Sequence, residues 1–233
     1  MTSARHGVLV IEASSARGSL ALIHAGRVEA TRSVPMGAGR DDALFPAISD
    51  LLGGGTGAPL MPEAIVCGSG PGSFTSLRIA ASLAKGLAHG AGIPVSAVPS
   101  LLLAAAAVPM EGPDEFIVHA DALRTERFAL AVRRGGDGSV EALGPVRRVS
   151  MEWVRDRVPP AERVAVGGEP EGLPGWCCVT PEAAALVRVV PAAYQVPVEL
   201  AEWEPAYGRL AEAQVQWEAT HGQSLPLTGP TFA

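Results

Sequence analysis

A turn rich in glycine and serine contains the residue types of this sequence that are best suited to binding an anion. The run from Ala64 to Cys67 is apolar and partly β-branched, which predicts a strand, and a helical pattern begins near Phe74. Ser73 is a favourable N-cap for that helix. Free N–H groups at such a helix start, together with the helix dipole, can hold a phosphate or a carboxylate. The residues that would contact an anion or a nucleotide here are Gly70, Gly72, Ser73, Thr75 and Arg78.

The same turn also suits a purely structural connection between a strand and a helix. Glycine lets the backbone turn sharply without Cβ clashes, and Pro71 removes one N–H donor. No Lys-Ser or Lys-Thr pair follows the glycines, and their spacing is not G-x-G-x-x-G, so neither common phosphate-binding motif is present. Both interpretations stay open at the level of sequence.

The sequence contains no recognisable motif for metal-dependent hydrolysis or for hydrolysis by a nucleophilic side chain. The five histidines never pair with one another, with Cys or with Glu at zinc-ligand spacing, so we expect no metal site. Ser73 lacks the glycine two positions later that a nucleophile elbow carries. A peptidase is therefore disfavoured, and we nominate no catalytic residue.

Two helices carry apolar faces that could meet either the chain's own core or a partner. The segment 74–91 has small residues at helical spacing and an adjoining apolar stripe, and the segment 41–52 has apolar residues at spacings of three and four. Small residues permit close approach of another helix or a sheet. The residues that we expect to bind a partner are Leu44, Ile48, Leu77, Ala80, Ala81, Ala84, Leu87 and Ala88.

Three segments together resemble the TsaB family. The longest is GSGPGSFTSLRIAASLAKGLAHGAGIPVSAVPSL, residues 68–101; the others are VLVIEASSARGSLAL, residues 8–22, and EPAYGR, residues 204–209. The resemblance is dense over residues 8–132. It implies an α/β, actin-like (ASKHA, ribonuclease-H-like) fold of two related lobes. It also implies a role in making threonylcarbamoyladenosine in tRNA, as the non-catalytic scaffold or dimerisation partner of the catalytic subunit TsaD, with the ATPase TsaE in the complex.

The resemblance also predicts where a phosphate site would lie and why it has degenerated. In actin-like ATPases the acids at two strand ends hold magnesium through water, and this chain has Glu12 where the family usually has Asp. The turn after it, which contains Ser14 and Ser15, has one glycine. Because Mg²⁺ demands strict octahedral geometry, we expect no cofactor of the chain's own, with a nucleotide at the partner interface instead. The alternative is a stand-alone ATPase or small-molecule kinase.

The charge of the chain indicates that it contacts tRNA only as part of a complex, and its hydropathy gives no sign of a membrane helix. The 233 residues have a formal net charge of −6 and a single lysine, Lys85. A protein that binds nucleic acid by itself usually has a positively charged surface patch. The pairs Arg124/Arg127, Arg133/Arg134 and Arg147/Arg148 suit solvated strand edges. No apolar run approaches the length of a membrane helix, and no signal peptide is evident, so we expect a cytoplasmic protein.

The two halves of the chain share one plan. Each half opens with a strand that ends in an acid, Glu12 in the first half and Asp121, 109 positions later, in the second. After each acid come a short turn with arginine, a second strand, a glycine turn and a third strand that contains Val-Glu-Ala. Turn formers at 108–114 mark the boundary. We predict a first lobe over 1–108, a smaller and less complete second lobe over 114–222, and a disordered tail over 223–233. An exposed helix pair in the first lobe also predicts a homodimer when the partner is absent.

Overall fold

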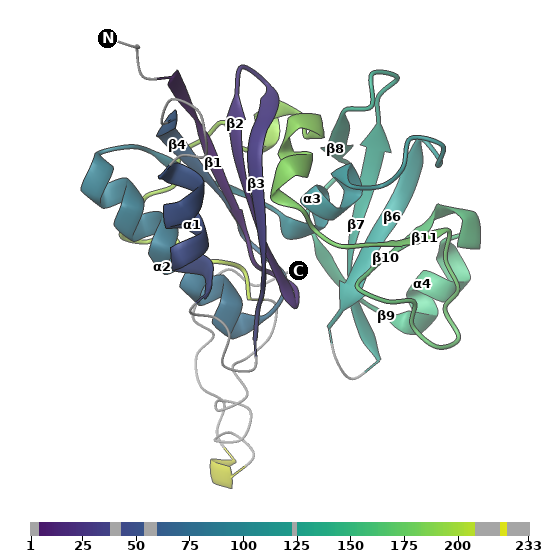
Figure 1. Ribbon diagram of the computed structural model, residues 1–233. Helices are drawn as coiled ribbons and strands as arrows, with labels where there is room; N and C mark the ends of the chain where they lie inside the picture. Colours follow the sequence, from purple (N-terminus) through teal and green to yellow (C-terminus); the bar gives the residue numbers. More distant parts are fainter. Residues whose placement is uncertain (1–4, 38–42, 54–59, 123–124, 208–219, 223–233) are drawn as a thin grey trace.

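Two mixed β-sheets lie side by side in the computed structural model, which describes residues 5–37, 43–53, 60–122, 125–207 and 220–222 (Figure 1). The first sheet has the strand order β3-β2-β1-β4-β5, with the first three strands antiparallel and β4 and β5 parallel to β1. Its strands are β1 (Arg5–Glu12), β2 (Arg17–His24), β3 (Arg27–Pro35), β4 (Leu60–Gly68) and β5 (Val95–Val98).

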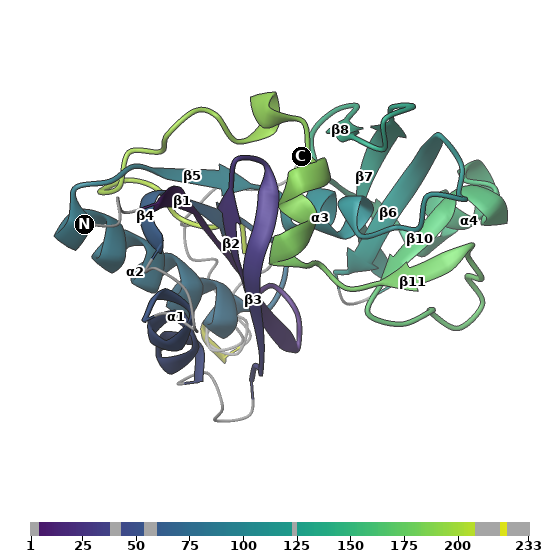
Figure 2. The same ribbon diagram turned by 45° about the horizontal axis from the view of Figure 1, so that its top comes forward.

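Both faces of the first sheet are covered, which explains why its central strands are apolar at nearly every position. In β1, Leu9 and Ile11 point to one buried cluster and Val10 to the other, as the period of two requires. Helices α1 (Leu44–Leu52) and α2 (Phe74–Ala91) cover one face of this sheet, side by side, and α3 (Ser100–Ala106) lies on the other (Figure 2).

The ends of α2 follow from local sequence. Ser73 accepts a hydrogen bond from the N–H of Ser76, and Gly92 adopts a left-handed conformation with φ of 66° at the C-cap. Helix α2 therefore spans residues 74–91, as predicted from the sequence. Helix α3 begins directly after Pro99, which occupies its N-cap.

The second lobe repeats the opening of the first. Strands β6, β7 and β8 form an antiparallel set, and β10 and β11 extend the sheet in parallel with β6, while β9 pairs with β7. The bounds are β6 (Glu115–Asp121), β7 (Glu126–Arg134), β8 (Val140–Ala142), β9 (Arg147–Ser150), β10 (Arg163–Val166) and β11 (Cys177–Val179). The predicted two-lobe actin-like α/β architecture is confirmed.

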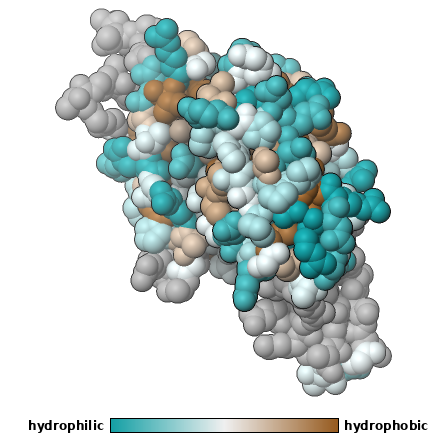
Figure 3. Space-filling view, turned by 90° about the vertical axis from the view of Figure 1, so that its right-hand side faces the viewer, coloured by the Kyte–Doolittle hydropathy of each residue, from teal (hydrophilic) through white to brown (hydrophobic). Residues whose placement is uncertain are grey.

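Helical structure is sparse in the described part of the second half, as predicted. It consists of α4 (Met151–Arg157), η2 (Pro160–Glu162), η3 (Ala183–Arg188) and η4 (Pro191–Ala193). The outward face of this lobe is mostly hydrophilic, with small separate apolar patches (Figure 3). None of the helices in the residues described above has the length and apolarity needed to cross a membrane.

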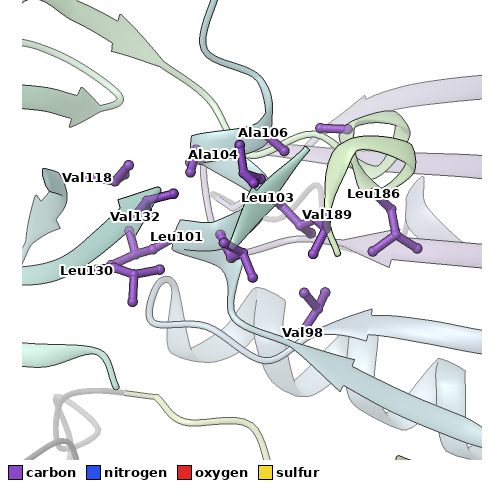
Figure 4. Close-up of a cluster of buried hydrophobic side chains, with 14 of the residues drawn as sticks. Val98, Leu101, Leu103, Ala104, Ala106, Val118, Leu130, Val132, Leu186 and Val189 are labelled. Carbon is purple, nitrogen blue, oxygen red and sulfur yellow. The ribbon is translucent and has the colours of Figure 1, made fainter. Parts of the chain in front are cut away.

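One continuous hydrophobic cluster joins the lobes. It contains Val10 and Val98 from the first sheet, Val118 and Leu130 from the second, and residues 101–106 of α3 between them. Figure 4 shows α3 side chains packed toward β6 and β7 on one side and toward Leu186 and Val189 on the other. Because α3 is buried all round, its run of leucine and alanine needs no polar face.

One segment within the predicted second lobe, at 114–222, packs against the first lobe. Residues 196–207 leave the second lobe and return to the first, where Val198 N–H donates to the Val95 carbonyl (2.8 Å) and Ala206 N–H to the Ser69 carbonyl (2.7 Å). This segment satisfies the otherwise free edge of β5, which explains its return. The boundary at 108–114 lies between α3 and β6, the extents of the two lobes stay predictions, and the tail 223–233 lies outside the described residues.

Candidate functional site

Glu12 lies at the carboxyl end of β1, but its carboxyl group points into the protein. The residue is 1% exposed. Its Oε1 accepts a hydrogen bond from Ser14 N–H (2.6 Å), and its Oε2 accepts one from the Ser100 hydroxyl (2.8 Å). A methyl group placed on Gly68, at the end of β4, would overlap this carboxyl group. Glu12 therefore joins the ends of β1 and β4 to the start of α3.

This burial changes the acid chemistry of Glu12. Burial raises the pKa of its carboxyl group, although hydrogen bonds from Ser14 and Ser100 act in the opposite direction. A carboxyl group whose two oxygens both accept hydrogen bonds from within the chain does not fit a magnesium ligand. No group of acidic, histidine or cysteine side chains among the described residues is arranged to hold a metal ion.

The serines of the predicted phosphate turn are also engaged within the chain. Ser14 is buried, and its carbonyl accepts a hydrogen bond from Ser73 N–H (2.8 Å). Ser15 is half-buried, and its hydroxyl donates to the Arg17 carbonyl and accepts from Arg17 N–H. A methyl group at Gly72 would overlap Ser14. The turn after β1 and the turn before α2 thus pack directly against each other.

The predicted anion contacts are only partly available for this reason. The N–H of Gly70 donates to the Ser100 hydroxyl (3.0 Å), and that of Ser73 to Ser14. Thr75 and Arg78 are exposed in the first turns of α2, with the Arg78 guanidinium 5.0 Å from the centre of the Phe74 ring. The anion or nucleotide contact stays a prediction, and among its residues Thr75 and Arg78 have exposed side chains.

The second acidic strand end is built differently. Asp121, at the end of β6, has a side chain that is 64% exposed, and its Oδ1 lies 3.4 Å from Arg127 Nη1. Arg127 is buried and also contacts Nδ1 of the buried His119, with Nε at 3.2 Å and Nη2 at 3.1 Å. Burial, and then the charges of Arg127 and Arg163, lower the pKa of His119 to about 4.

His119 is therefore neutral, and its Nδ1 is the acceptor. Its Nε2 has no hydrogen-bond partner in the part of the chain that the structure describes. We did not nominate His119 or Arg127 from the sequence. A polar residue in the apolar stretch FIVHA of β6 was the available signal, because a buried ionisable side chain needs a partner.

The structure corrects the predicted partner-binding residues. Seven of the eight are buried against the chain's own first sheet and covering segments, and only Leu87 is half-buried. Leu44 and Ile48 of α1 and Ala80, Ala84 and Ala88 of α2 belong to the cluster beneath these helices. Their faces are intrachain core, so a partner cannot contact them in this conformation.

The opposite face of α2 carries a second stripe of small residues that points outward. Ser82, Gly86 and Gly90 follow one another at intervals of four residues, and all three are exposed. A Cβ added at Gly86 or Gly90 would have nothing within 4 Å. Glycine inside a helix costs about 0.8–1 kcal/mol relative to alanine. These glycines therefore lower helix stability without any intrachain packing that requires them.

The arginine pairs are not all solvated strand edges. Arg133 is exposed and ion-paired to Glu115, with Nε to Oε1 at 2.9 Å, as expected of such an edge. Arg127 and Arg134 are buried instead, because side chains alternate along β7 and these two point to its covered faces.

Comparisons with known proteins agree with this architecture. Residues 42–161, just over half of the chain, match the family model of TsaD, the tRNA N6-adenosine threonylcarbamoyltransferase. The chain is 28% identical over 128 residues to the tRNA threonylcarbamoyladenosine biosynthesis protein TsaB of Haemophilus influenzae. It is 36% identical over 94 residues to the protein of that name from Bacillus subtilis. The matches cover 54% and 40% of this chain, and 54% and 41% of the length of those relatives.

A solved structure extends the likeness over most of the chain. YeaZ from Pseudomonas aeruginosa superposes with a TM-score of 0.69 and 25% sequence identity, covering 87% of this chain and 99% of the other. The sequence matches, the family model and this superposition all lead to one assignment. The chain belongs to the TsaB family.

Proposed function

We propose that this chain is a non-catalytic scaffold subunit of the complex that forms threonylcarbamoyladenosine in tRNA, where it binds and supports a TsaD homologue. The pathway comes from the names of its relatives. The observation that carries the scaffold role is the inward, doubly hydrogen-bonded carboxyl group of Glu12. An actin-like catalyst needs that acid in the cleft, whereas here both of its oxygens are hydrogen-bonded within the fold.

The outward face of α2 supports a docking role. Ser82, Gly86 and Gly90 leave room for another helix to approach closely, and Leu83 and Leu87 beside them are half-buried and can supply apolar contact. On the neighbouring helix α1, Phe45 is 56% exposed. Binding energy in interfaces concentrates in a few such side chains. The occupant that we assign to this face is the TsaD homologue.

Other members of the assembly follow from the same proposal. TsaE would join through the complex, and tRNA would be contacted only through it, since the net charge of this chain is −6. A second copy of the chain would cover the face when the partner is absent. A nucleotide at the partner interface would contact Thr75 and Arg78. Because the proposed substrate is tRNA, we place the protein in the cytoplasm.

The docking face is tested by a pair of matched glycine substitutions. Gly86 lies on the face and Gly144 in the second lobe; both are exposed, neither has a positive φ, and both have open space where a Cβ would be. In a co-expression pull-down with the cognate TsaD homologue, Gly86→Arg should lose binding and Gly144→Arg should retain it. A desolvated unpaired charge costs several kcal/mol, so affinity should fall at least ~100-fold.

Two results would contradict the proposal. Equal capture of TsaD by both variants would remove α2 as the docking face. Micromolar binding of Mg-ATP by the isolated chain, measured by calorimetry and lost in Glu12→Gln, would instead favour the stand-alone ATPase or kinase. The full proposal further requires that omitting the chain stops modification in a reconstituted reaction with TsaD, TsaE, tRNA, ATP and a threonylcarbamoyl donor.

A further inference from the structure

Arg134, the last residue of β7, is buried at the point where the chain crosses between the lobes. It is 5% exposed, whereas its neighbour Arg133 is exposed. Side chains alternate along the strand, so Arg134 shares a face with Leu130 and Val132, which belong to the cluster around α3. Its guanidinium carbon lies 5.3 Å from the centre of the Phe116 ring.

Two guanidinium groups hold the backbone of the segment that joins α3 to β6. Arg134 Nη1 donates to the carbonyl oxygens of Met110 (3.0 Å) and Gly112 (3.5 Å). Arg188, at the end of η3, donates from Nη1 to the Val108 carbonyl (3.0 Å). Three carbonyl groups within five residues of this connection therefore accept hydrogen bonds from charged donors, which are stronger than neutral ones.

Arg188 also fixes the connection to the rest of the second lobe. Its Nε donates to the Gly138 carbonyl (3.2 Å), in the turn that precedes β8, and its Nη2 lies 3.1 Å from Met110 Sδ. One side chain thus links the end of η3, the β7–β8 turn and the connection between the lobes.

The buried guanidinium group of Arg134 adds little net stability to the fold, because its desolvation is unfavourable. Burial, and then the nearby charge of Arg188, lower the pKa of Arg134. Its Nε and Nη2 have no hydrogen-bond partner among the described residues. Buried charges contribute little net stability, and their better-attested effect is to specify one arrangement. The arrangement specified here is the path of the chain between the lobes.

We propose that Arg134 and Arg188 form a clasp that holds residues 108–112 in one conformation, so that the two lobes keep a single relative orientation and do not open and close. A hinge works by changing φ and ψ at a few connecting residues, and carbonyl groups held by charged donors oppose that change. The hydrophobic cluster that spans both lobes, and the hydrogen bond from Ala183 N–H to the Ser19 hydroxyl (3.0 Å), act in the same direction. The clasp does not depend on the proposed docking role.

The test is an interlobe distance distribution measured by double electron–electron resonance on the full chain, with the labelled chain diluted into an excess of unlabelled chain so that distances between two copies do not contribute. Spin labels are attached at Gly90→Cys on α2 and Gly144→Cys in the second lobe, two exposed positions with open space. Cys177→Ser and Cys178→Ser remove the accessible native thiols, while Cys67 is buried. The chain with the arginines intact should give one narrow distribution.

Removing either arginine should broaden that distribution. Arg134→Met and Arg188→Met keep an apolar stem without the charge, and we expect a width about twofold larger. Arg133→Met, on the same strand but exposed and without contact to residues 108–112, is the matched control and should change nothing. Circular dichroism reports folding, and Arg134→Leu and Arg188→Leu, which also lack a hydrogen-bond donor, replace any methionine variant that does not fold. A broad or bimodal distribution with intact arginines would overturn the proposal, and so would a narrow one in the folded variants.

Discussion

Replacing Gly68 by alanine tests whether the Glu12 carboxyl group is an internal structural element. The methyl group would overlap that carboxyl and come within 3.1 Å of the Ser100 hydroxyl. Gly68 has no positive φ, so an alanine backbone is allowed and the effect comes from contact alone. The carboxyl would have to move and give up its bonds from Ser14 N–H and from Ser100.

The structure sets the size of the expected loss. Each hydrogen bond contributes about 0.5–1.5 kcal/mol, and a buried polar group left without a partner costs about 1–3 kcal/mol. The lower entropy of the unfolded alanine chain returns about 0.4–1 kcal/mol. The free energy of unfolding should therefore fall by about 2–4 kcal/mol, which lowers Tm by roughly 5–15 °C for a chain of this size.

A double-mutant cycle measured by urea denaturation separates this mechanism from general crowding. In a Glu12→Ala background the obstacle is gone, so Gly68→Ala should cost nothing or stabilise, with a coupling energy of about 2 kcal/mol or more. Gly86→Ala, where the added methyl group has nothing within 4 Å, is the control and should stabilise the chain by up to about 1 kcal/mol. An equal cost of Gly68→Ala in both backgrounds would refute the inward carboxyl group.

The remaining predictions concern buried groups that titrate and the buried face of α2. Because the pKa of Glu12 is raised in the folded chain, its contribution to stability is complete below the unfolded value of about 4.5 and is lost as pH rises through the folded value. Glu12→Gln, whose amide can accept from Ser14 N–H and donate to the Ser100 hydroxyl, should therefore gain stability relative to the native chain as pH rises above about 4.5; a difference independent of pH would contradict this. His119, with its pKa lowered to about 4, contributes stability that is complete above about 6.5 and is lost as pH falls toward its folded value, by about 3 kcal/mol in total. His119→Gln should remove that slope from chemical denaturation measured between these pH values, and an unchanged slope would exclude His119 as its source. Ala84→Arg should abolish folding by circular dichroism because Ala84 is fully buried, whereas Gly86→Arg, two residues further along α2, should remain folded. A folded Ala84→Arg chain would show that the assigned faces of α2 are wrong.

Much of the fold could be predicted because its signals are local. The bounds of α2 depend on Ser73 at one end and on the change of pattern near Gly92 at the other, all within a single stretch of chain. The repeated three-strand opening was visible because apolar residues and glycine turns recur around Glu12 and Asp121 with one spacing. The return of residues 196–207 to β5 was not visible, since pairing across 100 residues leaves no local pattern.

The faces of α2 show most clearly what sequence alone determined and what required the tertiary structure. The sequence determined that 74–91 is a helix and that it carries two stripes of small residues: Ala80, Ala84 and Ala88, and Ser82, Gly86 and Gly90. Only the packing of the helix on the first sheet decided that the alanines are core and the glycines face outward. The burial of Glu12 and of Arg134 was likewise decided by the tertiary structure. Their charge can be read from the chain, but whether a charged side chain meets water or a buried donor depends on elements brought together from distant parts of the sequence.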